Sequence, residues 1–350
     1  MNYPVISDGE RNKKTVPAAG KIKVVIDTDA FNEVDDQFAI AYALLSPERI
    51  QVEAVYAAPF SSNFFDDITR QEGKKLTQMT SSVAEGVEQS YQEILKIFQY
   101  LEMSPTEKVF RGSPIYLRDK YTPVPSEAAK DLVKRAMESE ETLYVAAIGA
   151  ITNIASAILM EPRIIEKIVV VWLAGQPLHW PHTLEFNLGQ DVFATQVILE
   201  SKVPLVMIPC MSVASHLTTT KQELIENLSG KSKIGTFLAD TATNAMVQTT
   251  PENAMDFFRS TYLRGVDDNQ STVPEDGQKK IANSRIIWDI SAIGYLIQPS
   301  WCPSNLVTAP KISEDICWEL QESGHQMRLC HYLYRDCIFG DMFQKLRKAP

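Results

Sequence analysis

The stretch KVVIDTDAFNEVDDQFAIAYALL, Lys23 to Leu45, joins one apolar run to another through a turn that is rich in aspartate. The run Val24–Ile26 is typical of a buried strand, and the segment from Gln37 onward is typical of a buried helix. The turn between them holds four acidic residues within ten positions: Asp27, Asp29, Asp35 and Asp36. They follow the C-terminal end of a strand, where open α/β sheets bind their ligands.

Four like charges on one turn repel one another unless a positive group shares the site. A hard divalent cation suits such a set of oxygen ligands. The alternative is that the acids are solvated and that Asp35 or Asp36 caps the following helix. A cap requires a single acidic residue and does not explain the pair Asp27 and Asp29. We therefore predict a metal site on this turn.

The composition limits the class of protein. The chain has 350 residues, 45% of them hydrophobic, which is enough to form a large core. Its formal net charge of −10 argues against binding to the phosphate backbone of a nucleic acid. Five cysteines without a CxxC spacing are typical of reduced, packed thiols. No apolar stretch is typical of a signal peptide or a membrane span. We expect a cytoplasmic enzyme that acts on a small molecule, with neither nucleic acid nor membrane as partner.

Strand-like and helix-like segments alternate along the chain. The predicted strands are Lys23–Ile26, Val52–Ala57, Leu143–Ile148, Ile168–Leu173 and Val203–Ile208. The predicted helices are Gln37–Leu45, Val87–Leu101, Ser126–Met137, Thr152–Leu159 and Val192–Glu200. This order favours an α/β fold with a mostly parallel, Rossmann-like central sheet and helices on both faces. We expect a flexible leader over residues 1–20, a single domain over residues 21–350 and a polar loop at Val266–Gly277.

A second polar cluster lies in the segment Leu143–Ala155. Its sequence predicts a strand, a tight turn at Gly149 and a helix that is capped by Thr152 or Asn153. Backbone carbonyls at such a strand end are suitable ligands for a hard cation. Any α/β protein contains junctions of this kind, so the signal is weak by itself.

A third cluster follows the predicted strand Ile168–Leu173. Glu185 and Asn187 are two residues apart and point to the same side if the chain is extended there. A carboxylate beside an amide suits a polyhydroxylated ligand such as a sugar. A polar surface loop explains the same pattern.

Asp289 is the fourth feature, the one acidic residue within the apolar segment Ile286–Ile293. A carboxylate in such surroundings needs a partner or a cation to offset its desolvation. The alternative is a helix N-cap. The neighbouring Trp288 is either a core residue or a flat surface on which a ligand ring could stack.

These four segments, in this order, resemble the nucleoside hydrolase family, the inosine–uridine-preferring N-ribohydrolases, from about residue 21 to residue 297. The resemblance implies a single α/β domain, a homodimer or homotetramer, and one Ca²⁺ ion at the base of the site. The family signature has two aspartates one residue apart and, three residues later, an aspartate pair. Asp27 and Asp29 match it, but five residues precede Asp35 here, and the usual Gly is missing.

The resemblance also implies a role for each matched residue. Asp29 corresponds to the general base, which also binds Ca²⁺, and Asp35 to the residue that holds the ribose 2′-hydroxyl. Glu185 and Asn187 correspond to residues that grip the ribose hydroxyls, and Asp289 also contacts the 3′-hydroxyl. The implied Ca²⁺ ligands are Asp29, Asp36, Asp289 and the main-chain carbonyl of Ile148.

Three positions depart from the family pattern. Trp288 stands where the inosine–uridine group has a His that helps protonate the leaving base, and it resembles the Trp that stacks on the base in the purine-specific group. The ribose-contacting Asn after the second strand is missing, and Asn63 is a substitute only if its loop folds back. His179 lies near the position of an Asn that reaches the 5′-hydroxyl.

The resemblance thus implies Ca²⁺-dependent hydrolysis of a ribonucleoside, with purines favoured, to free base and ribose. Asp29 and Trp288 are the expected catalytic residues. One alternative is a catalytically silent member of the same fold that binds a nucleoside or a sugar. Another is a haloacid-dehalogenase-type phosphotransferase, in which Asp27 would be the nucleophile, although Phe31 departs from that family's pattern.

Overall fold

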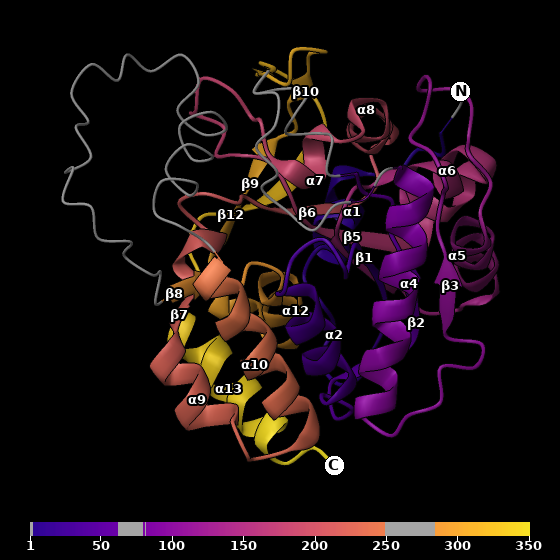
Figure 1. Ribbon diagram of the computed structural model, residues 1–350. Coiled ribbons are helices and arrows are strands. Elements are labelled where there is room, and N and C mark those ends of the chain that lie inside the picture. Colours follow the sequence, from indigo (N-terminus) through magenta and orange to yellow (C-terminus); the bar gives the residue numbers. More distant parts are fainter. Residues whose placement is uncertain (1–2, 62–79, 81, 249–283) are drawn as a thin grey trace.

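The computed structural model describes residues 3–61, 80, 82–248 and 284–350, and its centre is an eight-stranded sheet (Figure 1). The strand order is β3-β2-β1-β4-β5-β6-β12-β9, and β9 alone runs antiparallel to its neighbour. The strands are β1 (Ile22–Thr28), β2 (Ile50–Ala57), β3 (Val109–Arg111), β4 (Leu143–Ile148), β5 (Ile168–Leu173), β6 (Leu205–Ile208), β9 (Ser304–Thr308) and β12 (Gln326–Cys330).

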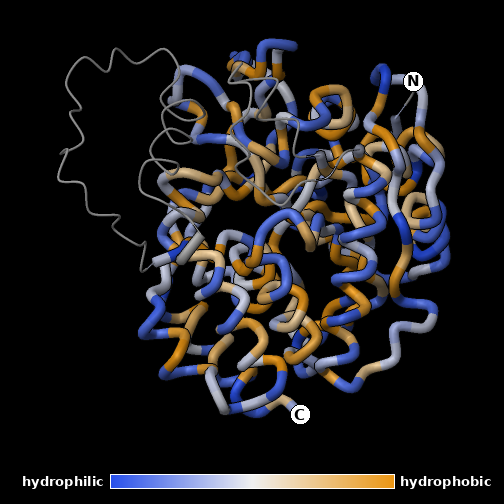
Figure 2. Tube along the Cα trace, in the orientation of Figure 1, coloured by the Kyte–Doolittle hydropathy of each residue, from blue (hydrophilic) through white to orange (hydrophobic). Residues whose placement is uncertain are grey.

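Helices cover both faces of this sheet. The residues of β1 alternate between two apolar cores, because Val24 and Ile26 belong to one and Val25 to the other. The first core includes residues of α2 (Asp36–Leu44), α4 (Val83–Tyr100), α9 (Lys221–Leu228), α10 (Lys233–Gln248), α12 (Ile290–Ile297) and α13 (Arg335–Arg347). The second includes residues of α5 (Glu127–Glu138), α6 (Thr152–Met160) and α8 (Val192–Ser201). Figure 2 shows hydrophobic segments gathered in the interior, between the more hydrophilic outer parts of the helices.

The order 3-2-1-4-5-6 is that of a doubly wound sheet, and its switch point lies between β1 and β4. The chain leaves β1 toward α2 on one face and leaves β4 toward α6 on the other. The aspartate-rich turn after β1 therefore lies at the carboxyl edge of the sheet, beside this switch point. The predicted mostly parallel sheet, with helices on both faces, is confirmed.

The predicted bounds of β4 and β5 agree with the structure residue for residue. β1 begins one residue earlier and ends two residues later than predicted, and the starts of β2 and β6 differ by two residues. Two smaller sheets pair β7 (Thr218–Thr220) with β8 (Ser284–Ile286) and β10 (Lys311–Ile312) with β11 (Trp318–Glu319). The segment after residue 300, which gave no signal in the sequence, extends the main sheet by β12 and β9. The loop expected at Val266–Gly277 lies outside the described residues. No helix in the described ranges is long and apolar enough to span a bilayer.

The flexible leader expected over residues 1–20 is wrong for the described part of that segment. Residues 8–14 form helix α1 (Asp8–Lys14), capped by Ser7. The guanidinium of Arg11 is buried and donates to the carbonyls of Ile6 and Lys202 at 2.9 and 3.0 Å. The hydroxyl of Tyr295 donates to the carbonyl of Thr15 at 2.7 Å. These long-range contacts attach the segment to the domain, which the polar composition did not reveal.

Candidate metal and substrate site

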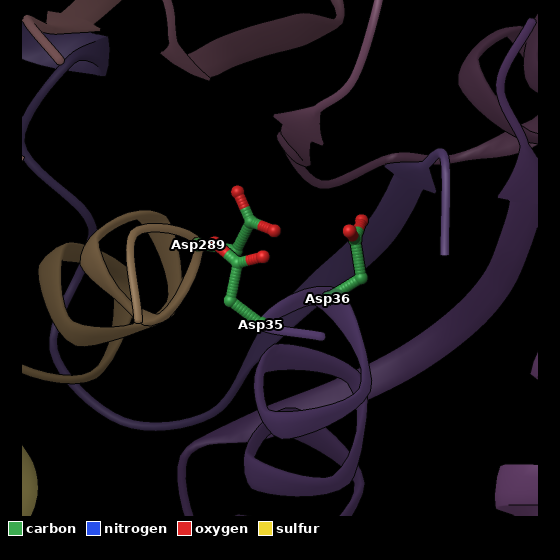
Figure 3. A group of neighbouring side chains, drawn as sticks. All are labelled: Asp35, Asp36 and Asp289. Carbon is green, nitrogen blue, oxygen red and sulfur yellow. The ribbon is translucent and has the colours of Figure 1, made fainter. Parts of the chain in front are cut away.

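Three carboxylates from two helix starts converge at the carboxyl edge of the sheet (Figure 3). Asp35 and Asp36 begin α2, and Asp289 directly precedes α12. One oxygen from each lies within 4.8 Å of the others, and all three residues are buried. The family resemblance implied that Asp36 and Asp289 converge together with Asp29. The group instead contains Asp35, which the resemblance assigned to the ribose.

Asp35 and Asp289 both occupy N-cap positions, yet neither side chain caps its helix. Oδ2 of Asp35 instead accepts the backbone N–H of Trp288 at 3.0 Å. The Asp36 carboxylate accepts a hydrogen bond from the Thr28 hydroxyl, which lies at the end of β1. The capping interpretation therefore does not account for these acids, and their oxygens are turned toward one another instead.

Asp29 follows β1 directly and is 2% exposed. Its Oδ2 is buried and has no hydrogen-bond partner among the described residues. Burial and, next, the Asp36 charge raise the pKa of Asp29 well above its ordinary value. Asp29 is not part of the group whose oxygens lie within 4.8 Å, but its charge also raises the pKa of Asp289.

The electrostatics of the cluster call for a positive partner. Burial, followed by the charges of Asp35 and Asp36, raises the pKa of Asp289. Burial raises the pKa of Asp36 to about 7. Burial, followed by the charges of Glu33 and Asp36, raises the pKa of Asp35 well above its ordinary value. The guanidinium of Arg285 opposes this only in part, and it also forms an ion pair with Glu33 at 2.9 Å. An all-oxygen donor set with an orphaned buried oxygen on Asp29 fits a hard divalent cation.

The turn between Asp29 and Asp35, two residues longer than the family signature, is held by local contacts. The side-chain amide of Gln37 donates to the carbonyl of Ala30 at 2.9 Å, and the Asn32 N–H donates to the carbonyl of Asp29 at 2.7 Å. The Glu33–Arg285 ion pair ties the same turn to the strand before Trp288. The extra length is thus absorbed in an ordered turn.

Asp27 lies on the opposite face of β1 from Thr28, whose hydroxyl contacts Asp36, because side chains alternate along a strand. The side-chain amide of Asn153 donates to Oδ1 of Asp27 at 2.8 Å. Oδ1 of Asn153 accepts the N–H of Ser113, also at 2.8 Å. The hydroxyl of Thr152 donates to Asp191 at 2.7 Å. The expectation that Thr152 or Asn153 caps α6 is therefore wrong, since both side chains bridge to other segments and Ile151 occupies the N-cap position.

Ile148 ends β4, and Thr28 at the end of β1 lies opposite it in the parallel register. The next residue, Gly149, is in close contact with Asp29. A Cβ at this glycine would lie 3.0 Å from Oδ1 of Asp29, so a side chain would displace that carboxylate. The Ile148 main chain thus lies at the edge of the site. Its role as a metal ligand stays a prediction.

Glu185 and Asn187 are not in an extended segment, so the expected same-side geometry is wrong. Glu185 precedes the short helix α7 (Phe186–Gly189) and Asn187 lies within it. The Glu185 carboxylate accepts the N–H groups of Gly175, Asn187 and Leu188 at 2.9–3.0 Å. Burial, opposed by these donors, raises the pKa of Glu185 to about 7. The Asn187 amide donates to the carbonyl of Leu173 at 3.1 Å. The side chains of Glu185 and Asn187 therefore stabilise the connection after β5.

The two aromatic candidates are placed differently. Trp288 is half-buried and packs against the apolar core that contains α2 and α12. His179 is exposed on the connection between β5 and α7. The expected contacts of Trp288 with the base and of His179 with the 5′-hydroxyl stay predictions. Asn63 lies outside the described residues.

Sequence reasoning missed three residues that meet at the carboxyl edge of the sheet, Ser61, Tyr116 and Gln190. The hydroxyl of Tyr116 lies 2.6 Å from Oε1 of Gln190, and the N–H of Ser61 donates to the same oxygen at 2.9 Å. Burial and, next, the charge of Asp29 raise the pKa of Tyr116. These residues come from three separate connections, so no spacing in the sequence links them.

Residues 24–330 match the family of inosine-uridine preferring nucleoside hydrolases. The chain belongs to this family. The haloacid-dehalogenase-type alternative is thereby excluded. Membership accounts for the acidic cluster, because nucleoside hydrolases are metal-dependent.

Individual relatives are distant. The pyrimidine-specific ribonucleoside hydrolase RihA of Escherichia coli is 23% identical over 189 residues, which are 53% of this chain and 59% of that protein, so the match spans little more than half of the relative's length. A plant nucleoside hydrolase, PpNRh1, aligns with a TM-score of 0.66 at 16% identity over 93% of this chain and 99% of its own. A purine-preferring ribonucleoside hydrolase from Gardnerella vaginalis aligns with a TM-score of 0.66 at 17% identity, over 93% of this chain and 98% of its own. These structures confirm the nucleoside hydrolase fold.

Proposed function

We propose that this protein hydrolyses the N-glycosidic bond of a ribonucleoside to release the free base and ribose. The observation that carries the proposal is the buried convergence of Asp35, Asp36 and Asp289 beside the partnerless Oδ2 of Asp29. Burying such a cluster of carboxylates without a cation costs free energy, and the packing of the fold does not require it. Family membership supports the same reaction.

Asp29, Asp36, Asp289 and the Ile148 carbonyl would hold Ca²⁺, which when bound supplies charge that polarises and orients a water molecule. Asp29 acts as the general base that takes a proton from the attacking water. Asp29 is buried, and its Oδ2 has no hydrogen-bond partner among the described residues that would have to be displaced before it accepts a proton. General-base catalysis is typically worth about 10²–10⁴-fold in rate.

The remaining acids act on the sugar. Cleavage of the bond develops positive charge on the ribose, as in other glycoside hydrolyses. The carboxylates of Asp35, Glu185 and Asp289 stabilise that charge and accept hydrogen bonds from the ribose hydroxyls, with the amide of Asn187 beside them. His179 would reach the 5′-hydroxyl from the connection between β5 and α7.

The leaving base is a purine in this proposal, because Trp288 offers an indole ring for stacking beside Asp35 and Asp289. A base stacked on an aromatic ring gains roughly 1–3 kcal/mol. The stack favours protonation of the purine as the bond breaks. The names of the relatives do not decide the base, since RihA is described as pyrimidine-specific and the Gardnerella vaginalis enzyme as purine-preferring.

A panel of purine and pyrimidine ribonucleosides tests the activity directly, with free ribose as the readout and Asp29→Asn as the control. We expect release of ribose by the wild-type protein with Ca²⁺ and a large loss in the variant. A specific observation favours a second candidate, a silent nucleoside-binding protein: Asp29 is outside the group of oxygens within 4.8 Å. Binding of a nucleoside without release of ribose would establish that candidate.

We also propose that the protein is a cytoplasmic homodimer or homotetramer, as the family resemblance implies. Light scattering of the purified chain measures the molar mass directly. A value near the 39.3 kDa of one chain would contradict the assembly.

A further inference from the structure

Gln190 directly follows α7, and only 8% of the residue is exposed. Three connections meet at its side chain. Ser61 lies just beyond β2, Tyr116 lies beyond β3, and Gln190 itself comes from the connection that contains Glu185 and Asn187. Parallel strands end at the same edge of a sheet, so this meeting point is at the edge that carries the acidic cluster.

The orientation of the Gln190 amide is determined by its partners. The backbone N–H of Ser61 can only donate, so the atom that it contacts at 2.9 Å must be the carbonyl oxygen Oε1. The Tyr116 hydroxyl donates to the same oxygen at 2.6 Å. Both lone pairs of Oε1 are thus used, and the opposite end of the amide is the donor Nε2.

That donor end is buried without a partner. Nε2 of Gln190 has no hydrogen-bond acceptor among the residues that the structure describes. A buried donor without an acceptor costs about 1–3 kcal/mol, so proteins rarely keep one unless a ligand or water fills the need. The contacts of Oε1 prevent the amide from turning its donor elsewhere.

The segments around the Gln190 amide are held by buried hydrogen bonds. The N–H of Leu117, next to Tyr116, donates to Asp191 at 2.9 Å, and Asp191 also accepts the hydroxyl of Thr152. The charge of Asp29 reaches the Tyr116 hydroxyl, as its contribution to the raised pKa of Tyr116 shows. A group beside the general base faces the sugar side of a bound nucleoside, because the base must lie next to the carbon that is attacked.

We propose that Gln190 is a further substrate-binding residue, whose Nε2 donates a hydrogen bond to a hydroxyl oxygen of the ribose, and that Tyr116 is its positioning residue. This inference rests on the proposed function, since it assumes a ribonucleoside in the site. The chemistry is complementary: the ionised aspartates only accept hydrogen bonds, whereas a ribose hydroxyl also has lone pairs that require a donor. Gln190 supplies that donor.

The test compares Gln190→Glu and Gln190→Met with a matched control, Gln196→Met. Gln190→Glu keeps an acceptor for Ser61 and Tyr116 but replaces the donor, and Gln190→Met removes both. Gln196 lies on α8 and donates to the carbonyl of Ile312 at 3.2 Å, away from the acidic cluster. We expect KM for inosine and for uridine to rise about tenfold in both Gln190 variants, by the same factor for the two bases, and to stay unchanged in the control. An unchanged KM in both variants, or a loss that depends on the base, overturns the assignment.

Deoxynucleosides identify the contact. With 2′-, 3′- and 5′-deoxyinosine as substrates, the penalty of Gln190→Met should disappear for the one analogue that lacks the contacted hydroxyl. A penalty that persists for all three would rule out a ribose hydroxyl as the acceptor. Tyr116→Phe should raise KM in the wild-type background and add nothing to Gln190→Met, since it acts through the amide. Additive losses would contradict its role as a positioning residue.

Calorimetry separates this inference from the proposed function. If the wild-type protein releases no ribose, the proposed function fails, and titration of inosine into the Ca²⁺-loaded protein still measures the role of Gln190. We then expect a dissociation constant about tenfold weaker in Gln190→Met than in the wild type. Equal constants, or no binding of inosine by the wild type, overturn the inference.

Discussion

The backbone N–H of Trp288 donates a hydrogen bond to Oδ2 of Asp35 at 3.0 Å. This contact joins the turn after β1 to the start of α12, although the two residues are 253 positions apart. It turns the Asp35 carboxylate away from the N–H groups of its own helix, which explains why an acid at the N-cap position does not cap. The main chain of Trp288 thereby lies next to the acidic cluster, while its side chain packs against the apolar core that contains α2 and α12.

Replacing Trp288 by Ala should affect natural purine nucleosides more than activated substrates. The variant loses a stacking surface worth roughly 1–3 kcal/mol, so we expect kcat/KM for inosine to fall about 10–100-fold. A nitrophenyl riboside, whose leaving group needs no protonation, should lose much less. The comparison is made by steady-state kinetics on both substrates, with Trp288→Phe as the control that keeps a ring. Equal losses on the two substrates would contradict stacking on the base.

Asp29→Asn should lower kcat about 10²–10⁴-fold, because it removes the general base while it keeps the shape of the side chain. The fold should be retained, since Oδ2 of Asp29 has no partner among the described residues to lose. Single-turnover release of ribose and the circular dichroism spectrum measure the two effects. A kcat near that of the wild type would eliminate Asp29 as the base.

Removal of the metal should destabilise the protein. A chelator leaves buried like charges without compensation, and saturation with Ca²⁺ at about 100 times its dissociation constant should add about 2.7 kcal/mol to the free energy of unfolding. Thermal unfolding with EDTA and with added Ca²⁺ measures this difference. Asp289→Asn removes one of the charges, so its metal-free form should be more stable than the metal-free wild type and should gain less from Ca²⁺. If neither EDTA nor Ca²⁺ changes the unfolding temperature of the wild-type protein, a structural cation at this cluster is excluded.

The stability of the metal-free protein should depend on the ionisation of Glu185. Its folded-state pKa is raised from 4.5 to about 7, chiefly by burial. Below about pH 4.5 the group is protonated in both states. As the pH rises toward 7, the unfolded chain releases the proton first, and the free energy of unfolding falls by up to about 3 kcal/mol. Urea unfolding at pH 5 and pH 7.5 measures the free energy of unfolding at both values. Between them this free energy should fall less in Glu185→Gln than in the wild type. Equal falls in the two proteins would refute the raised pKa of Glu185.

Asn153 should be important for stability, since its amide donates to Oδ1 of Asp27 and accepts the N–H of Ser113. Asn153→Ala leaves a buried carboxylate and a buried N–H unpaired, and we expect a loss of about 3 kcal/mol in the free energy of unfolding. Asn227→Ala is the matched control, because the Asn227 side chain is only partly buried: it donates to the carbonyl of Glu223 one turn earlier in its own helix and accepts from the guanidinium of Arg347 at the surface. Its loss should be about 1 kcal/mol or less. Equal losses at the two positions would show that the bridge to Asp27 adds nothing.

The local sequence already predicted much of the sheet. The apolar runs at β4 and β5 gave their bounds directly, because strands buried on both faces are apolar along their whole length. Three of the eight strands of the main sheet, β3, β9 and β12, were missed, and the predicted bounds of β1, β2 and β6 differ from the structure by one or two residues at one or both ends. The missed strands are short or lie toward an edge of the sheet, so part of their surface is polar or exposed and the apolar signal is weak.

By itself, the sequence determined the identity of the chemical groups: a set of aspartates at strand and helix ends, an amide beside a carboxylate, and a tryptophan before the last acid. Only the tertiary structure decided which of these groups meet. Asp35 joins Asp36 and Asp289, Asp27 turns to Asn153 on the opposite face, and Glu185 is occupied by backbone N–H groups. The Gln190–Tyr116 pair had no sequence signal at all. The physical reason is that hydrogen bonds and like-charge contacts between residues far apart in the chain depend on strand order and loop course, which no local spacing records.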